Sequence, residues 1–429
     1  MNVRKLNAVL LGSLIVSLFS GIRYETGVFI VRPFDVGMVG MVCLLAGVVA
    51  VSKRFHLPLN DPILLVFALF SSYVIVNGLL IGNTSRSINI LIQNIEFGLL
   101  SVLIADLARY PKYRAVFMKV LLWGLGLLAV GTALWYLSQG HVTRYKWRTT
   151  KQTFGLFAFL AFALFYWRRG QTYILLLAVT IILMILSGER KGWVAFVGAL
   201  AAVLIGGSLA ERKSLRSAFG QILRRGVLAG VLMTVLAYFL VDQFEYVRRQ
   251  VESFTGIMEA MTALGGFNYE VAGSGSNRVR LFLLDFTLQS VPEHPFFGVG
   301  TGRFGEMLEQ FALPGEKLAG SHSWYQRTVV ETGLVGLGLF VLLWGLMLKR
   351  GLSLMRNATP GQRFAAIVGL GLTAYGATIA LFTGGGGARN LIYLMMPAGL
   401  LVGMTDEQKR RRRTRGNASG RQTRARVPQ

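Results

Sequence analysis

A histidine stands directly before a helix-start signal in the last third of the chain. Ser323, followed three residues later by Gln326, has the spacing of a capping box, which predicts that a helix begins at Ser323 with His322 one residue outside it. The positive end of the helix macrodipole would attract a phosphate and keep the imidazole neutral, so that it can accept a proton near neutral pH. A purely structural histidine is the alternative at this stage.

A glycine-rich segment at 273–304 precedes this histidine. Glycine turns let backbone amides approach a bound group, for which phosphate is the usual guest, whereas simple tight turns are the alternative. His294, directly before Pro295, more simply fixes a turn than takes part in chemistry. The glycines and candidate polar residues of this segment include Gly273, Gly275, Arg278, Arg280, His294, Gly298, Gly300 and Gly302.

Motifs that bind nucleotides or metals are missing from the sequence. It contains no Walker loop, no dinucleotide fingerprint after a strand, no paired-histidine zinc motif and no aspartate-rich metal motif. We therefore expect no cofactor and no metal, so an enzyme of this sequence would need a substrate that is already activated.

The composition is that of a membrane protein. Hydrophobic residues make up 53% of the 429 residues and charged residues only 15%, which a soluble globule could not cover. The net charge of +25 is no sign of nucleic-acid binding, because the cations lie in short clusters between apolar blocks, where they set orientation and meet anionic lipid. The single cysteine, Cys43, excludes an intramolecular disulfide.

The apolar blocks predict an all-α integral membrane protein of about twelve transmembrane helices, each long enough to cross a bilayer. The first block ends without a small-x-small cleavage site, so we expect a helix and not a cleaved signal peptide. The predicted spans are 6–22, 36–52, 62–81, 88–106, 116–138, 153–167, 171–187, 192–209, 226–243, 325–348, 364–383 and 390–405.

The distribution of positive charge predicts the orientation. The clusters on the side of the N-terminus hold more than half of the lysines and arginines, which makes that side cytoplasmic. Both termini are then cytoplasmic. The predicted organisation is helices 1–9 in 1–243, an external loop domain with short helices in 244–324, helices 10–12 in 325–405 and a basic cytoplasmic tail in 406–429.

Two external loops carry positive charge that this rule disfavours. The 141–151 loop has four cations and two aromatic residues, and Arg190 and Lys191 follow the seventh span. Such charge predicts a bound anion. For the 141–151 loop the alternative is that Tyr145 and Trp147 are interface anchors whose neighbouring cations meet lipid headgroups.

Three segments resemble the O-antigen ligase family. The run from His322-Ser323 to Gly333-Leu-Val-Gly336 is similar to the signature of these ligases, and 278–304 resembles the external loop of the wider ligase and polymerase superfamily. Ser187-Gly-Glu-Arg190 resembles the family's serine-arginine element at the end of a span. The sequence departs from the family pattern in a serine after the histidine, where many relatives have asparagine, and in two residues between Ser187 and Arg190.

The resemblance implies a GT-C-like enzyme of the bacterial inner membrane. Such an enzyme transfers a glycan from undecaprenyl pyrophosphate to a sugar hydroxyl of lipid A-core on the periplasmic face, with no metal or nucleotide. It implies that His322 is the catalytic base and that Arg190 and Arg278 bind pyrophosphate, for which planar guanidinium groups are suited. Weaker candidates are Arg280, Arg389, Arg144, Lys146, Arg148 and Glu331, the last of which would orient His322 or an arginine.

Other functions compete with this interpretation. A polysaccharide polymerase or a protein O-oligosaccharyltransferase of the same superfamily would share the fold and the donor. A transporter of lipid-linked polysaccharide is a rival from another class, because polar residues such as Asn94, Glu96 and Asp106 lie within predicted spans. Against it, the sequence shows no obvious inverted repeat.

Overall fold

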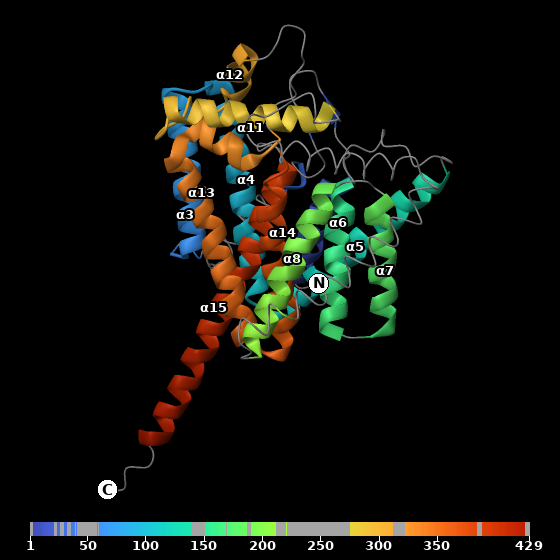
Figure 1. Ribbon diagram of the computed structural model, residues 1–429. Helices are drawn as coiled ribbons and strands as arrows, with labels where there is room; N and C mark the ends of the chain where they lie inside the picture. The colour runs from blue at the N-terminus through green and yellow to red at the C-terminus, as the bar shows by residue number, and fades with distance from the viewer. Residues whose placement is uncertain are drawn as a thin grey trace.

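The protein is almost entirely helical in the part that the computed structural model describes, which is residues 3–20, 24–25, 30–31, 36–38, 40, 58, 60–138, 151–168, 170–186, 190–211, 220, 275–311, 322–383 and 388–424. Its long helices run side by side as a bundle (Figure 1). One short antiparallel pair, β1 (Tyr24–Glu25) and β2 (Ile30–Val31), accompanies them. The helices are α1 (Val3–Ser20), α3 (Pro62–Leu80), α4 (Thr84–Ala108), α5 (Pro111–Ser138), α6 (Lys151–Arg168), α7 (Gln171–Leu186), α8 (Arg190–Ala210), α11 (Gly275–Glu293), α12 (Phe304–Phe311), α13 (Trp324–Asn357), α14 (Pro360–Ile379) and α15 (Ala388–Arg424).

The predicted spans coincide with these helices wherever the structure describes them. Among the described residues, four helices are long and apolar enough to cross a membrane, namely α3, α4, α8 and α13, and shorter apolar helices lie at Phe154–Arg168 and Gln171–Met184. The predicted span 36–52 is described only at 36–38 and 40, and the span 226–243 lies outside the described residues. A multi-pass membrane protein is therefore confirmed, and the number of twelve spans stays a prediction.

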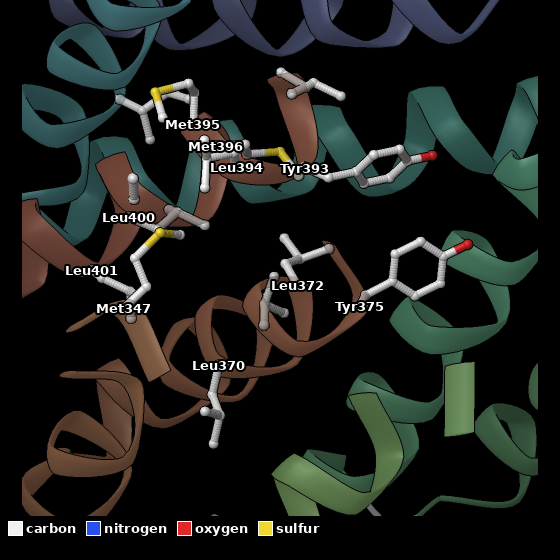
Figure 2. Packing of buried hydrophobic residues seen from close by; sticks show 14 of the residues in the cluster. Met347, Leu370, Leu372, Tyr375, Tyr393, Leu394, Met395, Met396, Leu400 and Leu401 are labelled. Carbon is white, nitrogen blue, oxygen red and sulfur yellow. The ribbon is translucent and has the colours of Figure 1, made fainter. Parts of the chain in front are cut away.

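Most side chains of α14 and of the first half of α15 are buried within the bundle. Figure 2 shows Leu372 and Tyr375 of α14 on the side of α15, with the rings of Tyr375 and Tyr393 5.5 Å apart, whereas Leu370 points away from α15. Gly399 and Gly403 lie one turn apart on α15, where an added Cβ would come within 2.5 Å of the Ser101 and Ala105 carbonyl oxygens of α4. Small residues at this spacing let two helix backbones approach closely in a membrane.

The positively charged clusters gather at one end of the bundle. Arg114 donates to Glu407 at 2.6 Å, and both side chains are buried. Arg4 and Arg410 both lie over the ring of Tyr110, at 4.5 and 5.3 Å from its centroid. Segments from α1, α5 and α15 thus share the end where α4 stops, as the charge rule requires of one membrane side.

The opposite end is covered by α11, which lies across the bundle in Figure 1 at the end where α13 begins. A small apolar core joins α11 to α12 and to the first turns of α13. Its buried members are Leu283, Phe286, Val299, Phe304, Leu308, Val329 and Val330. This packing gives α11 a defined position above the start of α13.

Candidate active site

The helix α13 begins after Ser323, as the capping-box spacing predicted. Ser323 is the N-cap, with its side chain accepting a hydrogen bond from the Gln326 N–H at 3.4 Å, and the helix begins at Trp324. The Trp324 N–H donates to the Ala380 carbonyl at 2.7 Å and so ties this start to the end of α14. His322 lies one residue outside the helix, as predicted.

His322 is half-buried and lies among positive charges. Burial holds the pKa of its imidazole below the usual 6.5, and the nearby charges of Arg280 and Lys191 lower it further. The neutral state that the sequence predicted is therefore favoured, but the causes are burial and two cations from other helices. A neutral imidazole can accept a proton.

The predicted pyrophosphate ligands belong to the same helices as these two cations. Arg190 is the first residue of α8, directly before Lys191, and Arg278 lies in the first turn of α11, two residues before Arg280. Arg280 was predicted from its location alone, and the structure brings it close enough to His322 to act on its charge. Lys191 was expected, with Arg190, to meet a bound anion, and its action on the charge of His322 was not predicted.

The structure does not describe the side chains of the other candidate cations, so it gives no distance between them and His322. Arg389 lies in the first turn of α15, and the structure describes the backbone but not the side chains of Arg190, Arg278 and Arg389. Arg144, Lys146 and Arg148 lie outside the described residues. Their roles stay predictions.

His322 and the two cations that lower its pKa lie near the starts of three helices. His322 directly precedes α13, Lys191 is the second residue of α8 and Arg280 lies in the second turn of α11. Helix N-termini present unpaired N–H groups and a positive partial charge, and they favour bound anions. Combined with the cationic side chains, this arrangement is suited to an anionic group next to a proton acceptor.

The position of this site depends on a break in α13. Gly333 has φ +66° and ψ −167°, which interrupts the helix. The loop at 294–302 packs its backbone into the break: the Leu334 N–H donates to the Pro295 carbonyl at 2.8 Å, and the Val299 N–H donates to the Val330 carbonyl at 2.9 Å. An added Cβ at Gly333 would lie 2.2 Å from the Phe296 carbonyl oxygen, so only glycine suits both the dihedral and the contact.

The loop at 298–301 holds neighbouring helices together through its backbone. The N–H groups of Gly298, Val299 and Gly300 donate to the carbonyls of residues 294, 330 and 331. The Thr301 N–H donates to the Asn77 side chain at 2.7 Å. Because these four amides are paired within the protein, the structure favours tight turns over a phosphate cradle at 298–301, and Gly273 lies outside the described residues.

Hydrogen bonds from α3 also hold this loop and the break in α13 in place. The Tyr73 hydroxyl of α3 donates to the Thr332 carbonyl at 2.8 Å, and the Asn77 amide donates to the Phe297 carbonyl at 2.7 Å. Gly336 lies against Thr332 and Tyr73, whereas an added Cβ at Gly338 would have no described atom within 4 Å.

Replacing the glycine at the break tests this arrangement. Gly333→Ala is expected to lower the melting temperature in detergent clearly, because a positive φ costs alanine about 1–2 kcal/mol and the loop must also move away from the new methyl group. Gly338→Ala is the matched control in the same helix, and it should leave the melting temperature unchanged or raise it slightly. Equal melting temperatures for the two variants would contradict the break.

Glu331 is buried beside the site and pairs with an arginine that the sequence analysis did not single out. Arg327 donates to its carboxylate at 2.9 Å, and the Phe304 N–H donates to the same oxygen at 3.4 Å. Glu331 thus orients an arginine. The i, i+4 spacing of the two residues could have predicted this ion pair from the sequence. Both residues line a cavity of about 50 Å³ with Gln93 and Asn94, which is large enough for water but not for a sugar.

The fold and the site together define a multi-pass membrane protein with a basic, histidine-containing site at one end of its bundle. The family model described as O-antigen ligase matches residues 174–341, which include α8, α11, His322 and the first half of α13. Over residues 174–341 this match bears out the resemblance that the motifs predicted. Members of this family are glycosyltransferase-like enzymes, which favours an enzyme over a transporter. No match to a curated protein was found.

Proposed function

We propose that this protein is an O-antigen ligase. It would transfer a glycan from undecaprenyl pyrophosphate to a sugar hydroxyl of lipid A-core, on the periplasmic side of the bacterial inner membrane. The observation that carries the proposal is the position of a half-buried His322 beside Arg280 and Lys191, within the segment that matches the family.

His322 is the general base in this proposal. Its nitrogen accepts the proton of the acceptor hydroxyl while the acceptor oxygen bonds to the anomeric carbon of the donor sugar. The bond between that carbon and the pyrophosphate oxygen breaks, and undecaprenyl pyrophosphate leaves with the electron pair. The low pKa of His322 keeps the accepting form populated at neutral pH.

The arginines stabilise the leaving group. Arg190 and Arg278 lie in the first turns of the helices that also carry Lys191 and Arg280, so pyrophosphate bound at the two helix N-termini would meet both backbone N–H groups and guanidinium groups. Negative charge on the pyrophosphate grows as the glycosidic bond breaks. Preorganised positive charge is therefore worth more in the transition state than in the ground state.

Reconstitution of the purified protein tests the activity. In detergent, with a lipid-linked glycan donor, lipid A-core, excess chelator and no nucleotide, we expect glycan-capped lipid A-core. Product in detergent excludes transport as the sole activity, because detergent leaves no compartments. Failure to form product, or a strict need for a divalent ion, would contradict the proposal.

A gene disruption separates the ligase from the polymerase of the same superfamily. Loss of all capped lipopolysaccharide is expected for a ligase. Lipopolysaccharide capped with single repeats would instead identify a polymerase. A polymerase would use the same lipid-linked donor, so the site alone does not separate the two enzymes.

The pH dependence of transfer tests the surroundings of the base. Because the pKa of His322 is depressed, kcat/KM should fall only below pH 6.5, as the imidazole becomes protonated. Lys191→Gln removes one of the charges that lower this pKa, so the acid limb should move to higher pH. The measurement is a kcat/KM profile between pH 5 and 8.

Lys349→Gln is the matched control for this profile, since Lys349 is an exposed lysine in the second half of α13, away from His322. It should leave the acid limb in place. A limb that Lys191→Gln also leaves in place would show that Lys191 does not act on the base.

A further inference from the structure

A long groove lies at the end of the bundle opposite His322. It has a volume of about 520 Å³ and is bordered by α5, α6, α7 and α14. Figure 1 shows α5, α6 and α7 standing together beside α14, with the turn between α6 and α7 at the end remote from α11. Most of the lining is apolar: Met118, Leu122, Trp123, Phe157, Leu160 and Leu164.

Positive side chains line the groove without a matching negative one. Its cations are Arg114, Lys119 and Arg168, and no carboxylate is among the lining residues. Arg114 is already neutralised by Glu407 at 2.6 Å. Within the described part of the chain, no ion pair involves Lys119 or Arg168, so the groove carries an excess of about two positive charges, each of which favours an anion.

Lys119 lies near the charged end of an apolar helix. It is the fourth residue of the predicted span 116–138, and its side chain is exposed. A lysine at this level extends its ammonium group to the membrane interface, where anionic headgroups lie. Its position therefore favours a bound negative group at the interface.

Arg168 is held at the rim of the same groove by stacking. Its guanidinium lies over the Trp167 ring at 4.0 Å, and the Trp167 ring is 5.0 Å from that of Phe364 on α14. Tyr173, at the start of α7, borders the same rim. Aromatic residues and cations at this level are typical of the membrane interface, where lipid headgroups lie.

We propose that this groove binds one anionic phospholipid. The headgroup phosphate lies between Lys119 and Arg168, and an acyl chain follows the apolar wall toward Gly126 and Phe157. Basic pockets between transmembrane helices bind anionic headgroups in this way. The apolar length of the groove favours a lipid over free phosphate, and its distance from His322 separates it from the site proposed for the glycan donor.

Lipid binding measured by native mass spectrometry tests the proposal. The full-length protein is titrated in detergent with phosphatidylglycerol or with phosphatidylcholine. Wild type should retain phosphatidylglycerol preferentially. The double variant Lys119→Gln/Arg168→Gln should bind it roughly ten- to thirtyfold more weakly, because two headgroup contacts are lost.

The matched control is Lys349→Gln/Arg356→Gln, which removes two exposed cations of α13 that do not line the groove. It should bind phosphatidylglycerol as wild type does. Equal retention of the two lipids by wild type, or equal weakening by the two double variants, would overturn the site.

A second variant tests the acyl-chain half of the groove. An added Cβ at Gly126 meets only Phe157, at an ordinary 3.6 Å, so Gly126→Leu should be accommodated by the helix while its side chain fills the groove. It should weaken phosphatidylglycerol binding, and excess inorganic phosphate should not displace the lipid. Unchanged lipid binding by Gly126→Leu together with displacement by phosphate would identify a simple anion site and overturn the lipid proposal.

Discussion

His322→Ala is expected to lower the rate of glycan transfer by about 10²–10⁴-fold, the usual cost of losing a general base. The fold should survive, because α13 is capped by Ser323 and tied to α14 through the Trp324 N–H, and neither contact uses the imidazole. The measurement is the initial transfer rate at saturating donor and acceptor, with the melting temperature in detergent as the test of folding.

His294→Ala is the matched control for this prediction. The His294 side chain is exposed, and the contact of this residue with Gly298 is made by its backbone carbonyl, which alanine retains. Its transfer rate should stay within a few-fold of wild type. A comparably small effect of His322→Ala would remove His322 from the role of base.

The parts of the fold that follow from local chemistry could be predicted from the sequence. Apolar runs of membrane-spanning length become helices because a backbone in lipid must pair its own polar groups. The start of α13 could be placed to the residue, since a capping serine and the following helix are neighbours along the chain. The place of His322 directly before this helix could be predicted for the same reason, whereas its role as base rests on the family resemblance.

The break in α13 could not be predicted in this way. Gly333 lies within the predicted span 325–348, and this sequence predicts one continuous helix. The positive φ is stabilised by hydrogen bonds to Pro295 and Phe296 in a loop that precedes the helix, and by Tyr73 of α3. Only the folded structure brings these partners together. The glycine pattern alone could therefore not distinguish a loop that packs against α13 from a loop that binds phosphate.

The surroundings of His322 could be predicted only in part, because some of its neighbours come from helices that are distant in the sequence. Its neutral state could be expected from its place before a helix, but the actual causes include Lys191 of α8 and Arg280 of α11. These helices are far apart in the sequence, and no spacing rule joins them. The Arg327–Glu331 pair was accessible to sequence reasoning, because its two residues are one helical turn apart.

Arg190→Lys and Arg278→Lys are each expected to lower turnover by roughly 10–1000-fold, although both keep the positive charge. The reason is shape. A guanidinium offers a rigid planar fork that binds two phosphate oxygens, whereas an ammonium acts as a point charge. If these arginines served only to attract anionic lipid, lysine should replace them with little loss.

The controls for this prediction must be arginines without a structural partner to lose. Arg350 is unsuitable, because it pairs with Asp61, the N-cap of α3. Arg356 and Arg363 are exposed and lie near the ends of α13 and α14 remote from His322, so Arg356→Lys and Arg363→Lys should keep turnover near that of wild type. The decisive quantity is turnover at saturating donor, since the pyrophosphate charge that these arginines are proposed to stabilise develops as the bond breaks. Near-normal turnover of both Arg190→Lys and Arg278→Lys would exclude them as the pyrophosphate ligands and would make the cations of the 141–151 loop the next to test.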